Sequence, residues 1–415
     1  MKFVAPQQPV LIRADRLLDG TGDVIEGAAL LFRGARIVAV GRQADLGTPD
    51  NARIIESKGT LIPGLCDAHV HLRTPGTPGE GHADELGMAR MSFAEIALRA
   101  ASLAQASLRA GFTTLRDVGA PGGTIIDLRR AIEAGHTEGP RIKAAGMGLS
   151  VTGGHMDAPG WGDHVALHGM TAPCNGPEGF REGVRAQLKR GADLIKLNTW
   201  VSRHDSPDIF WRREMTEAEI AAACDEAHAQ GVHVAAHVYG PEGVAASVRN
   251  GVDSIEHGHW LDEPTVELME RHGTTYVPTL TVNDQHARMA LTDPNLPERF
   301  KRWHRASSEA KWHSLDMVRR GGIRVCTGTD SGFQIENGKW GAHELELLVR
   351  GGFSPLEAIT CATANCADLL GTEAGRLKPG KFADLVLVEG DPLADISVLA
   401  DPTRLRVFKD GREVH

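Results

Sequence analysis

Two histidines separated by one residue stand in an apolar run that would otherwise be buried. His69 and His71 lie in the stretch LCDAHVHL, and alternate residues of a β-strand point to the same face. Apolar residues occupy both faces of residues 61–72, which is typical of a strand covered on both sides. Two buried imidazoles need a polar partner, and a metal ion would satisfy both rings. The alternative for an isolated pair is two solvated histidines at a strand end.

Short apolar runs alternate with helical patterns in the middle of the chain. The strands and helices that these segments predict must position the two histidines. Residues 93–111 and 216–231 carry apolar side chains at helical spacing, and the second segment opens with a capping box from Thr216 to Glu219. We expect eight strands, at Leu65–Val70, Thr113–Val118, Ile142–Ala145, Leu194–Leu197, Val232–His237, Ser254–His257, Thr275–Pro278 and Ile323–Gly328.

Eight β/α units predict an α/β fold of the (β/α)8 TIM barrel type, which typically needs about 250 residues before insertions. A doubly wound open sheet is the alternative, but the glycine-rich phosphate-binding fingerprint that such a sheet normally carries near its start is missing from the sequence. Both ends of the chain instead contain short alternating runs and turns. We therefore expect a small β-sandwich domain built from residues 1–62 and 372–415, with the catalytic barrel at 63–371.

Composition excludes several classes of protein. The formal net charge is −9, with 45 Lys and Arg against 54 Asp and Glu and no basic block, so a nucleic-acid partner is not expected. The 6 cysteines show no paired spacing, which favours reduced thiols in a cytoplasm. No apolar run approaches the length of a signal core or a membrane span. We expect a cytoplasmic protein that binds a small molecule and not a membrane.

Polar residues stand where several of the expected strands end, and the active sites of such barrels lie at the carboxyl ends of the strands. The residues are His69, His71, Lys196, His237, His257 and Asp330. Imidazole and carboxylate ligands suit Zn²⁺ or a similar divalent ion. An ammonium group cannot bind a cation, so Lys196 must either point away or be carboxylated by CO₂, which would make it an anionic carbamate able to bridge two metals.

Six stretches together resemble a known family: LIPGLCDAHVHL, GADLIKL, HVAAHVYG, DSIEHGH, TGTDSG and GRLKPGKFADLVLVEGDPL. They are similar to the amidohydrolase superfamily, in particular to its imidazolonepropionase-like proteins, its bacterial Xaa-Pro and Xaa-Arg dipeptidases and its ochratoxin-hydrolysing members. The resemblance implies a hydrolase with two divalent metal ions, most simply Zn²⁺. By this resemblance His69, His71 and Asp330 would hold the more buried metal, His237 and His257 the other, and carboxylated Lys196 would bridge them.

The resemblance implies attack by a metal-bridging hydroxide on the amide or peptide bond of a dipeptide or an N-acyl amino acid. Two metals lower the pKa of a shared water toward about 7, and Asp330 is placed to take its proton and return it to the leaving amine. Two alternatives stay open. A cyclic amidase of the imidazolonepropionase type would use the same metals on a ring amide, and a metal-binding protein without catalysis would not need Asp330 as a proton carrier.

Other residues are candidates for contacts with the substrate. The Tyr239 phenol is a candidate donor to an oxyanion or a carboxylate, and packing against the rim is its alternative. His155 lies in a glycine-rich loop that resembles the GGH segment of the family, in which the imidazole contacts substrate, and a solvent-facing histidine is its alternative. Asp117 is interpreted as structural, fixing the loop after the second expected strand.

The segment after Lys196 departs from the dipeptidase pattern, because it lacks a Gly-Gly pair and reads NTWVSRHDSPDIFWRRE. Its aromatic residues predict a lid over the pocket, and its amide and guanidinium groups predict a clamp for a substrate carboxylate. The aromatic residues are Trp200, Phe210 and Trp211, and the donors are Asn198, Arg203, Arg212 and Arg213. An aromatic leaving group, as in ochratoxin, would suit this wall. The alternatives are tryptophans at an oligomer contact and solvated arginines, and we expect a homo-oligomer.

Overall fold

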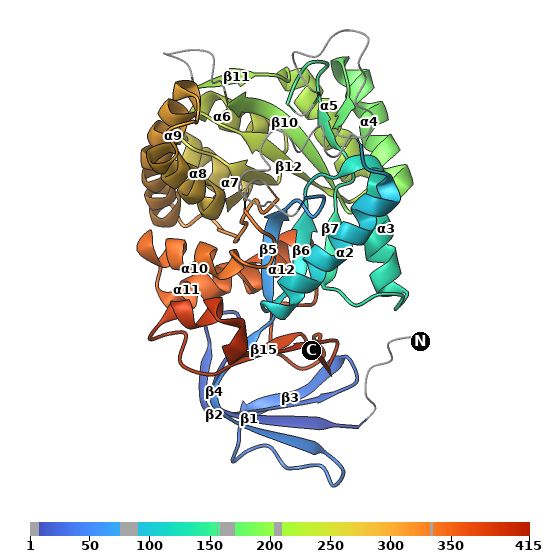
Figure 1. Ribbon diagram of the computed structural model, residues 1–415, viewed down its shortest axis with the longest axis vertical. Helices are drawn as coiled ribbons and strands as arrows, with labels where there is room; N and C mark the ends of the chain where they lie inside the picture. The colour runs from blue at the N-terminus through green and yellow to red at the C-terminus, as the bar shows by residue number, and fades with distance from the viewer. Residues whose placement is uncertain (1–7, 75–89, 156, 158–170, 203–209, 333–334) are drawn as a thin grey trace.

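The computed structural model describes residues 8–74, 90–155, 157, 171–202, 210–332 and 335–415 (Figure 1). Segments from both ends of the chain build one seven-stranded sheet in the order β17-β16-β15-β4-β1-β2-β3. Its strands are β1 (Val10–Leu18), β2 (Val24–Arg33), β3 (Arg36–Arg42), β4 (Arg53–Pro63), β15 (Leu385–Val388), β16 (Leu405–Lys409) and β17 (Arg412–Glu413). Strands from both ends of the chain therefore lie in the same sheet.

The terminal sheet wraps around its own apolar face. Ile12, Leu30 and Phe408 are fully or almost fully buried within one core cluster on that face. Strand β4 joins the two ends of the chain, because it runs parallel to β1 and antiparallel to β15. Edge strand β3 also exchanges backbone hydrogen bonds with residues 380–383. The described strands thus form one seven-stranded sheet, and a β-sandwich stays a prediction.

The middle of the chain holds parallel strands in two sheets. The first contains β5 (Leu65–Val70), β6 (Phe112–Asp117) and β7 (Arg141–Ala144). The second, in the order β14-β13-β12-β10-β8-β9, contains β8 (Gly148–Ser150), β9 (Thr171–Pro173), β10 (Leu194–Ser202), β12 (His233–Val238), β13 (Ser254–His257) and β14 (Thr275–Val277). A short strand, β11 (Trp211–Arg213), pairs antiparallel with β10.

Backbone hydrogen bonds connect the two parallel sheets. Residues 324–327 bond to Tyr276 of β14 on one side and to Ala68 of β5 on the other. On the opposite side the Asp193 N–H, just before β10, donates to the carbonyl of Ala144 in β7. These bonds bring the parallel strands together around a shared interior. A closed ring of eight strands stays a prediction.

Two of the expected strands differ from their predicted form. The third ends at Ala144, and the chain turns at Gly146, whose φ is +73°, before it resumes as β8. The eighth, expected over Ile323–Gly328, forms only an isolated bridge between Val325 and Tyr276. In that segment the Thr327 hydroxyl donates to the Cys66 carbonyl, so a side chain supplies part of the pairing that a regular ladder would make.

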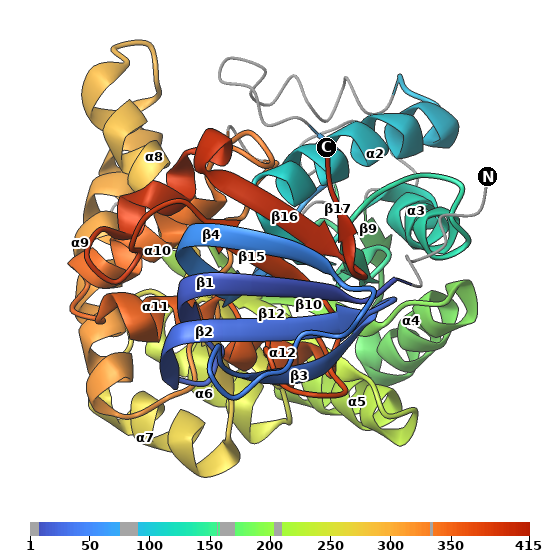
Figure 2. The ribbon, with the colours of Figure 1, turned by 90° about the horizontal axis from the view of Figure 1, so that it is seen from below.

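Helices surround the parallel strands, and the terminal sheet lies against one end of that assembly (Figures 1 and 2). They are α2 (Phe93–Arg109), α3 (Thr124–Glu133), α4 (Gly176–Arg190), α5 (Glu217–Ala229), α6 (Pro241–Arg249), α7 (Glu263–His272), α8 (Leu280–Thr292), α9 (Glu298–Arg320), α10 (Gly341–Arg350), α11 (Pro355–Cys361) and α12 (Ala364–Leu370), with 3₁₀ turns at Pro121–Gly123, Ile396–Ala400 and Pro402–Arg404. The capping box of Thr216 and Glu219 opens α5 as predicted. Within the described ranges, none of these helices combines the length and the apolar character that crossing a membrane requires.

Candidate metal centre

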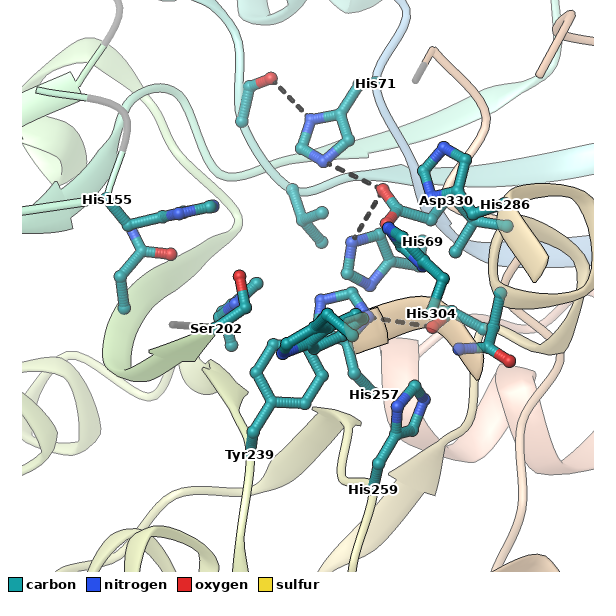
Figure 3. A pocket seen from close by; sticks show the side chains of 18 of the residues that line it. His69, His71, His155, Ser202, Tyr239, His257, His259, His286, His304 and Asp330 are labelled. Carbon is teal, nitrogen blue, oxygen red and sulfur yellow. Dashed lines mark hydrogen bonds and ion pairs between the residues drawn. The ribbon is translucent and has the colours of Figure 1, made fainter. Parts of the chain in front are cut away.

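Strand β5 and the segment after residue 327 bring three ligand-type side chains together. Oδ1 of Asp330 lies 3.5 Å from Nε2 of His69 and 3.4 Å from Nε2 of His71 (Figure 3). Within the part of the chain that the structure describes, these three residues form the group whose potential ligand atoms all lie within 4.8 Å of one another. Two imidazole nitrogens and one carboxylate oxygen at this spacing suit a divalent metal ion.

The other nitrogen of each β5 imidazole is already engaged. Nδ1 of His69 lies 2.6 Å from Oε2 of Glu256, and Nδ1 of His71 donates to the Gly119 carbonyl at 2.9 Å. A hydrogen bond at Nδ1 fixes the ring orientation and leaves Nε2 as the nitrogen that would bind a metal. Both Nε2 atoms therefore face the same point beside Asp330.

A buried ion pair between Arg116 and Glu256 lies beside His69 and holds its ring. The Arg116 guanidinium donates to Oε1 of Glu256 at 2.7 Å, to Ser254 Oγ at 3.0 Å and to the Ala68 carbonyl. Burial alone would raise the pKa of Glu256, but Arg116 and the hydrogen bond from His69 hold it well below its usual range. The sequence prediction missed both residues of the pair. The available signal was a carboxylate next to His257 in an apolar strand.

Two further histidines approach the same region from β12 and β13. The His237 and His257 rings lie 4.5 Å apart, and the His257 ring lies 5.1 Å from that of His69. Burial lowers the pKa of His69 to about 4 and lowers those of His237 and His257 well below the usual value, so these rings are neutral, as metal ligands must be. Lys196 of β10 is buried beside them, and burial lowers its pKa to about 8.

Unpartnered buried atoms test whether a cation fits this arrangement. Nε2 of His237 and Oδ1 of Asp330 are buried and have no hydrogen-bond partner among the described residues. An imidazole nitrogen and a carboxylate oxygen in that situation cost free energy unless another group satisfies them. A metal ion would satisfy both atoms, so the donor set fits metal binding.

Backbone strain is concentrated at the same place. Among the described residues, the non-glycine residues with positive φ are His257, Trp260, Thr279, Asp330 and Asp410. The first four lie at or beside the histidine cluster, and only Asp410 lies in the terminal sheet. Such conformations cost roughly 1–3 kcal/mol each and persist only where surrounding contacts hold them.

A cavity of about 600 Å³ opens above the histidine cluster. Asn198, His155 and Tyr239 line it as predicted, and the His155 ring lies 4.4 Å from that of His237. The Tyr239 ring stands perpendicular to the His237 ring at 5.0 Å. Burial raises the pKa of Tyr239, so its phenol keeps its proton and remains a donor. Burial lowers the pKa of His155 to about 4, so this ring is neutral.

Helices α8 and α9 supply the opposite wall of the cavity, which the sequence prediction missed. This wall contains Val282, His286, Phe300, Trp303 and His304. The Trp303 ring packs edge-on against Tyr239 at 5.1 Å. The aromatic surface that faces the cavity therefore comes from α9, and the apolar spacing of that helix gave no sign of its position.

The aromatic residues and arginines of the predicted lid and clamp that the structure describes do not line the cavity. Trp200 packs against Gly243 of α6 and is not among the residues that line the cavity. Phe210 stacks on Trp260 at 5.5 Å, outside the lining. Arg212 pairs with Glu214 at 3.3 Å, with 46% of its side chain exposed. Arg203 lies outside the described residues.

Trp211 and Arg213 are also absent from the described lining of the cavity. The Trp211 ring lies 5.2 Å from that of Trp260, and Arg213 is exposed. Among the described residues, the arginines that line the cavity are Arg73, which follows β5, and Arg299 of α9.

Asp117 has the structural role expected of it. Its carboxylate accepts the Leu72 N–H at 2.8 Å and the Gly119 N–H at 3.1 Å. These bonds fix the turn whose Gly119 carbonyl receives Nδ1 of His71. Asp117 therefore acts on the metal centre through the backbone.

Comparison with known proteins agrees with this geometry. Ochratoxinase from Aspergillus niger is 30% identical over 97% of this chain and 86% of its own length, and its crystal structure superposes with a TM-score of 0.84 at 29% identity, covering 98% of this chain and 95% of that chain. A crystal structure of a Xaa-Pro dipeptidase with bound methionine gives a TM-score of 0.86 at 30% identity, covering 98% and 99%. Imidazolonepropionase from Streptomyces griseus is 26% identical over 88% of this chain and 86% of its own length.

A family model covers most of the chain. The model described as "Amidohydrolase family" matches residues 60–414, a range that includes every residue of the candidate metal centre. Together with the relatives above, this match shows that the chain belongs to the amidohydrolase family.

Proposed function

We propose that this protein is a hydrolase with two divalent metal ions that cleaves the amide bond of a dipeptide or an N-acyl amino acid. The observation that carries the proposal is the convergence of four imidazoles and Asp330 on one cavity, with two buried ligand atoms among them that have no hydrogen-bond partner in the described structure. Relatives named ochratoxinase and Xaa-Pro dipeptidase support the amide bond as the target. The same relatives support a (β/α)8 barrel as the scaffold.

The ligands divide into two groups in the proposal. His69, His71 and Asp330 would hold the first metal, and His237 and His257 would hold the second. Lys196, once carboxylated by CO₂, would be an anionic ligand for both, and its lowered pKa favours the unprotonated amine that carboxylation needs. Zn²⁺ suits the imidazole-rich set. When bound, the ions supply Lewis acidity toward the substrate carbonyl and lower the pKa of a bound water.

The protein side chains move the protons and hold the substrate. The Asp330 carboxylate takes a proton from the attacking water and returns it to the leaving amine. The Tyr239 phenol and the His155 imidazole donate to the carbonyl oxygen or to the carboxylate of the substrate. Trp303 and Phe300 exclude water from the side of the cavity that faces the leaving group.

The lining of the cavity favours one class of substrate. Trp303, Phe300 and Val282 form an apolar wall wide enough for an aromatic side chain. Arg73 and Arg299 place positive charge on the same lining, which favours a substrate with a free carboxylate. We therefore propose amides of aromatic amino acids as the preferred class.

Two measurements test the proposal together. Protein purified without chelator is expected to contain two metals per chain, and removal of the metals is expected to abolish hydrolysis. A substrate panel then compares an N-acyl-phenylalanine, its amidated counterpart, an Xaa-Pro dipeptide and a cyclic amide. The N-acyl-phenylalanine is expected to have the highest kcat/KM of the panel. The kcat/KM of its amidated form is expected to be lower by a factor of roughly 10 or more.

Three other outcomes of these measurements would contradict all or part of the proposal. Preference for the cyclic amide would assign the protein to ring opening, and bound metal with no turnover on any substrate would leave metal binding as its role. Equal kcat/KM for the acid and the amide would remove the carboxylate contact from the proposal.

A further inference from the structure

Thr279, between β14 and α8, has a backbone conformation that its side chain opposes. Its φ and ψ are 49° and 51°, and it is fully buried. A β-branched residue in this left-handed region is an outlier, whereas glycine takes the same conformation without steric cost. The surroundings of Thr279 must therefore hold it there.

The first turn of α8 is held by a buried carboxylate from another helix. Glu344 of α10 accepts the Leu280 N–H at 2.9 Å, the Thr281 N–H at 2.7 Å and the Thr281 hydroxyl at 2.6 Å. Lys311 of α9 donates to the Leu280 carbonyl at 3.3 Å. The Glu344 and Lys311 side chains are completely buried. These contacts satisfy helix N–H groups that would otherwise lack partners and fix the residue that precedes them.

The fixed hydroxyl of Thr279 meets a candidate metal ligand. Thr279 Oγ1 lies 2.8 Å from Nδ1 of His257, which itself has a positive φ of 69°. With Nδ1 engaged, the remaining nitrogen of His257, Nε2, is the one available to a metal. The same hydrogen bond sets the angle of the ring in its plane.

We propose that Thr279 is a positioning residue that orients His257 as a ligand of the second metal, and that Glu344 acts on His257 through Thr279. This inference rests on the two-metal function proposed above. It adds a support for the second site that resembles what Glu256 provides for the first. Thr279 directly precedes α8, the helix whose Val282 and Asn283 line the substrate cavity.

Three substitutions separate the hydroxyl from the backbone strain. Thr279→Ser keeps the hydroxyl, Thr279→Val removes it at constant shape, and Thr279→Gly removes it and also relieves the positive φ. Thr292→Val, at the exposed end of α8, is the matched control. Each variant is loaded with Zn²⁺, and metal content per chain is followed during titration with a chelator, beside its thermal unfolding.

We expect the second metal to bind roughly 10- to 100-fold more weakly in the Val and Gly variants. The first metal should be unchanged in both, and the Ser and Thr292 variants should match the wild type. Thr279→Gly should unfold at a temperature no lower than the wild type, because its conformation suits glycine. Glu344→Gln, which weakens the anchor of α8, should weaken the second metal by less than Thr279→Val does.

Two results would overturn the inference in different ways. Wild-type affinity for both metals in Thr279→Gly and Thr279→Val would show that the hydroxyl does not position His257. Fewer than two tightly held metals in the wild-type chain would refute the two-metal function on which the inference rests.

Discussion

The two walls of the cavity are built in different ways. The strand wall carries the histidines and Asp330. Hydrogen bonds with the Glu256 carboxylate, the Gly119 carbonyl and the Thr279 hydroxyl fix three of its rings at Nδ1, those of His69, His71 and His257. In the helix wall, from α8 and α9, Trp303 packs edge-on against Tyr239 at 5.1 Å, and its indole N–H donates to the Phe210 carbonyl at 3.0 Å. Rigid support at the strand wall suits chemistry that every substrate shares, and packed aromatic rings suit selection among substrates.

The largest effect should come from Asp330→Asn on the strand wall. This change removes the proton carrier and preserves the shape, so kcat should fall by roughly 10² to 10⁴ for all substrates while most of the metal stays bound. Steady-state kinetics and metal analysis check it, with Asp401→Asn on the surface as a control. Activity within a few-fold of the wild type would assign the proton transfer to another group.

Glu256→Gln should have the next largest effect, on folding. The change leaves the Arg116 guanidinium buried without its counter-charge, which costs about 3–5 kcal/mol in the free energy of unfolding. Denaturant titration measures the loss. The control is Glu373→Gln, whose ion pair with Arg36 is exposed to solvent and should contribute little to the free energy of unfolding. Similar losses in both variants would show that the buried pair gives no special support.

Trp303→Leu should separate the two walls. The change removes aromatic surface from the helix wall, so the ratio of kcat/KM for an N-acyl-phenylalanine to that for an N-acyl-alanine should fall by roughly 10-fold. Metal content should stay at the wild-type level. An equal loss on both substrates would mean that Trp303 supports the metal centre and does not select the substrate.

The smallest effect is expected from Arg213→Gln. This arginine is exposed and does not line the cavity, so kcat/KM for a carboxylate substrate should change by no more than about two-fold and stability by within about 0.5 kcal/mol. A ten-fold loss confined to substrates with a carboxylate would restore the clamp that the sequence suggested after β10.

The strand wall could be predicted from the sequence because its signal is local. His69, His71, His237 and His257 each stand at the carboxyl end of an apolar run, where the family pattern is also strongest. The Arg116–Glu256 pair joins β6 to β13, strands that are far apart in the chain. No local spacing indicates which buried charges meet across an interior.

The position of Trp200 shows why its predicted place in a lid over the pocket could not be read from the sequence. Lys196, Asn198 and Trp200 alternate in sequence, and in a regular strand they would share a face. The register of β10 against β12 shifts between Asn198 and Trp200, and such an irregularity interrupts the alternation. Trp200 consequently packs against α6, while Trp303 reaches the cavity from a helix about a hundred residues further along. Tertiary packing of this kind leaves no periodic signal.

The pairing of β4 with β15 has a consequence for the order in which the protein assembles. Strand β4 presents an open edge from the moment it is synthesised, and its partner Leu385–Val388 is made only after the catalytic segment. Ribosomal synthesis normally lets N-terminal units fold first, but here the N-terminal strands wait for the C-terminal ones. An unpaired edge of this kind attracts other strands. The edge of β4 therefore stays open to such contacts until β15 has been synthesised and has paired with it.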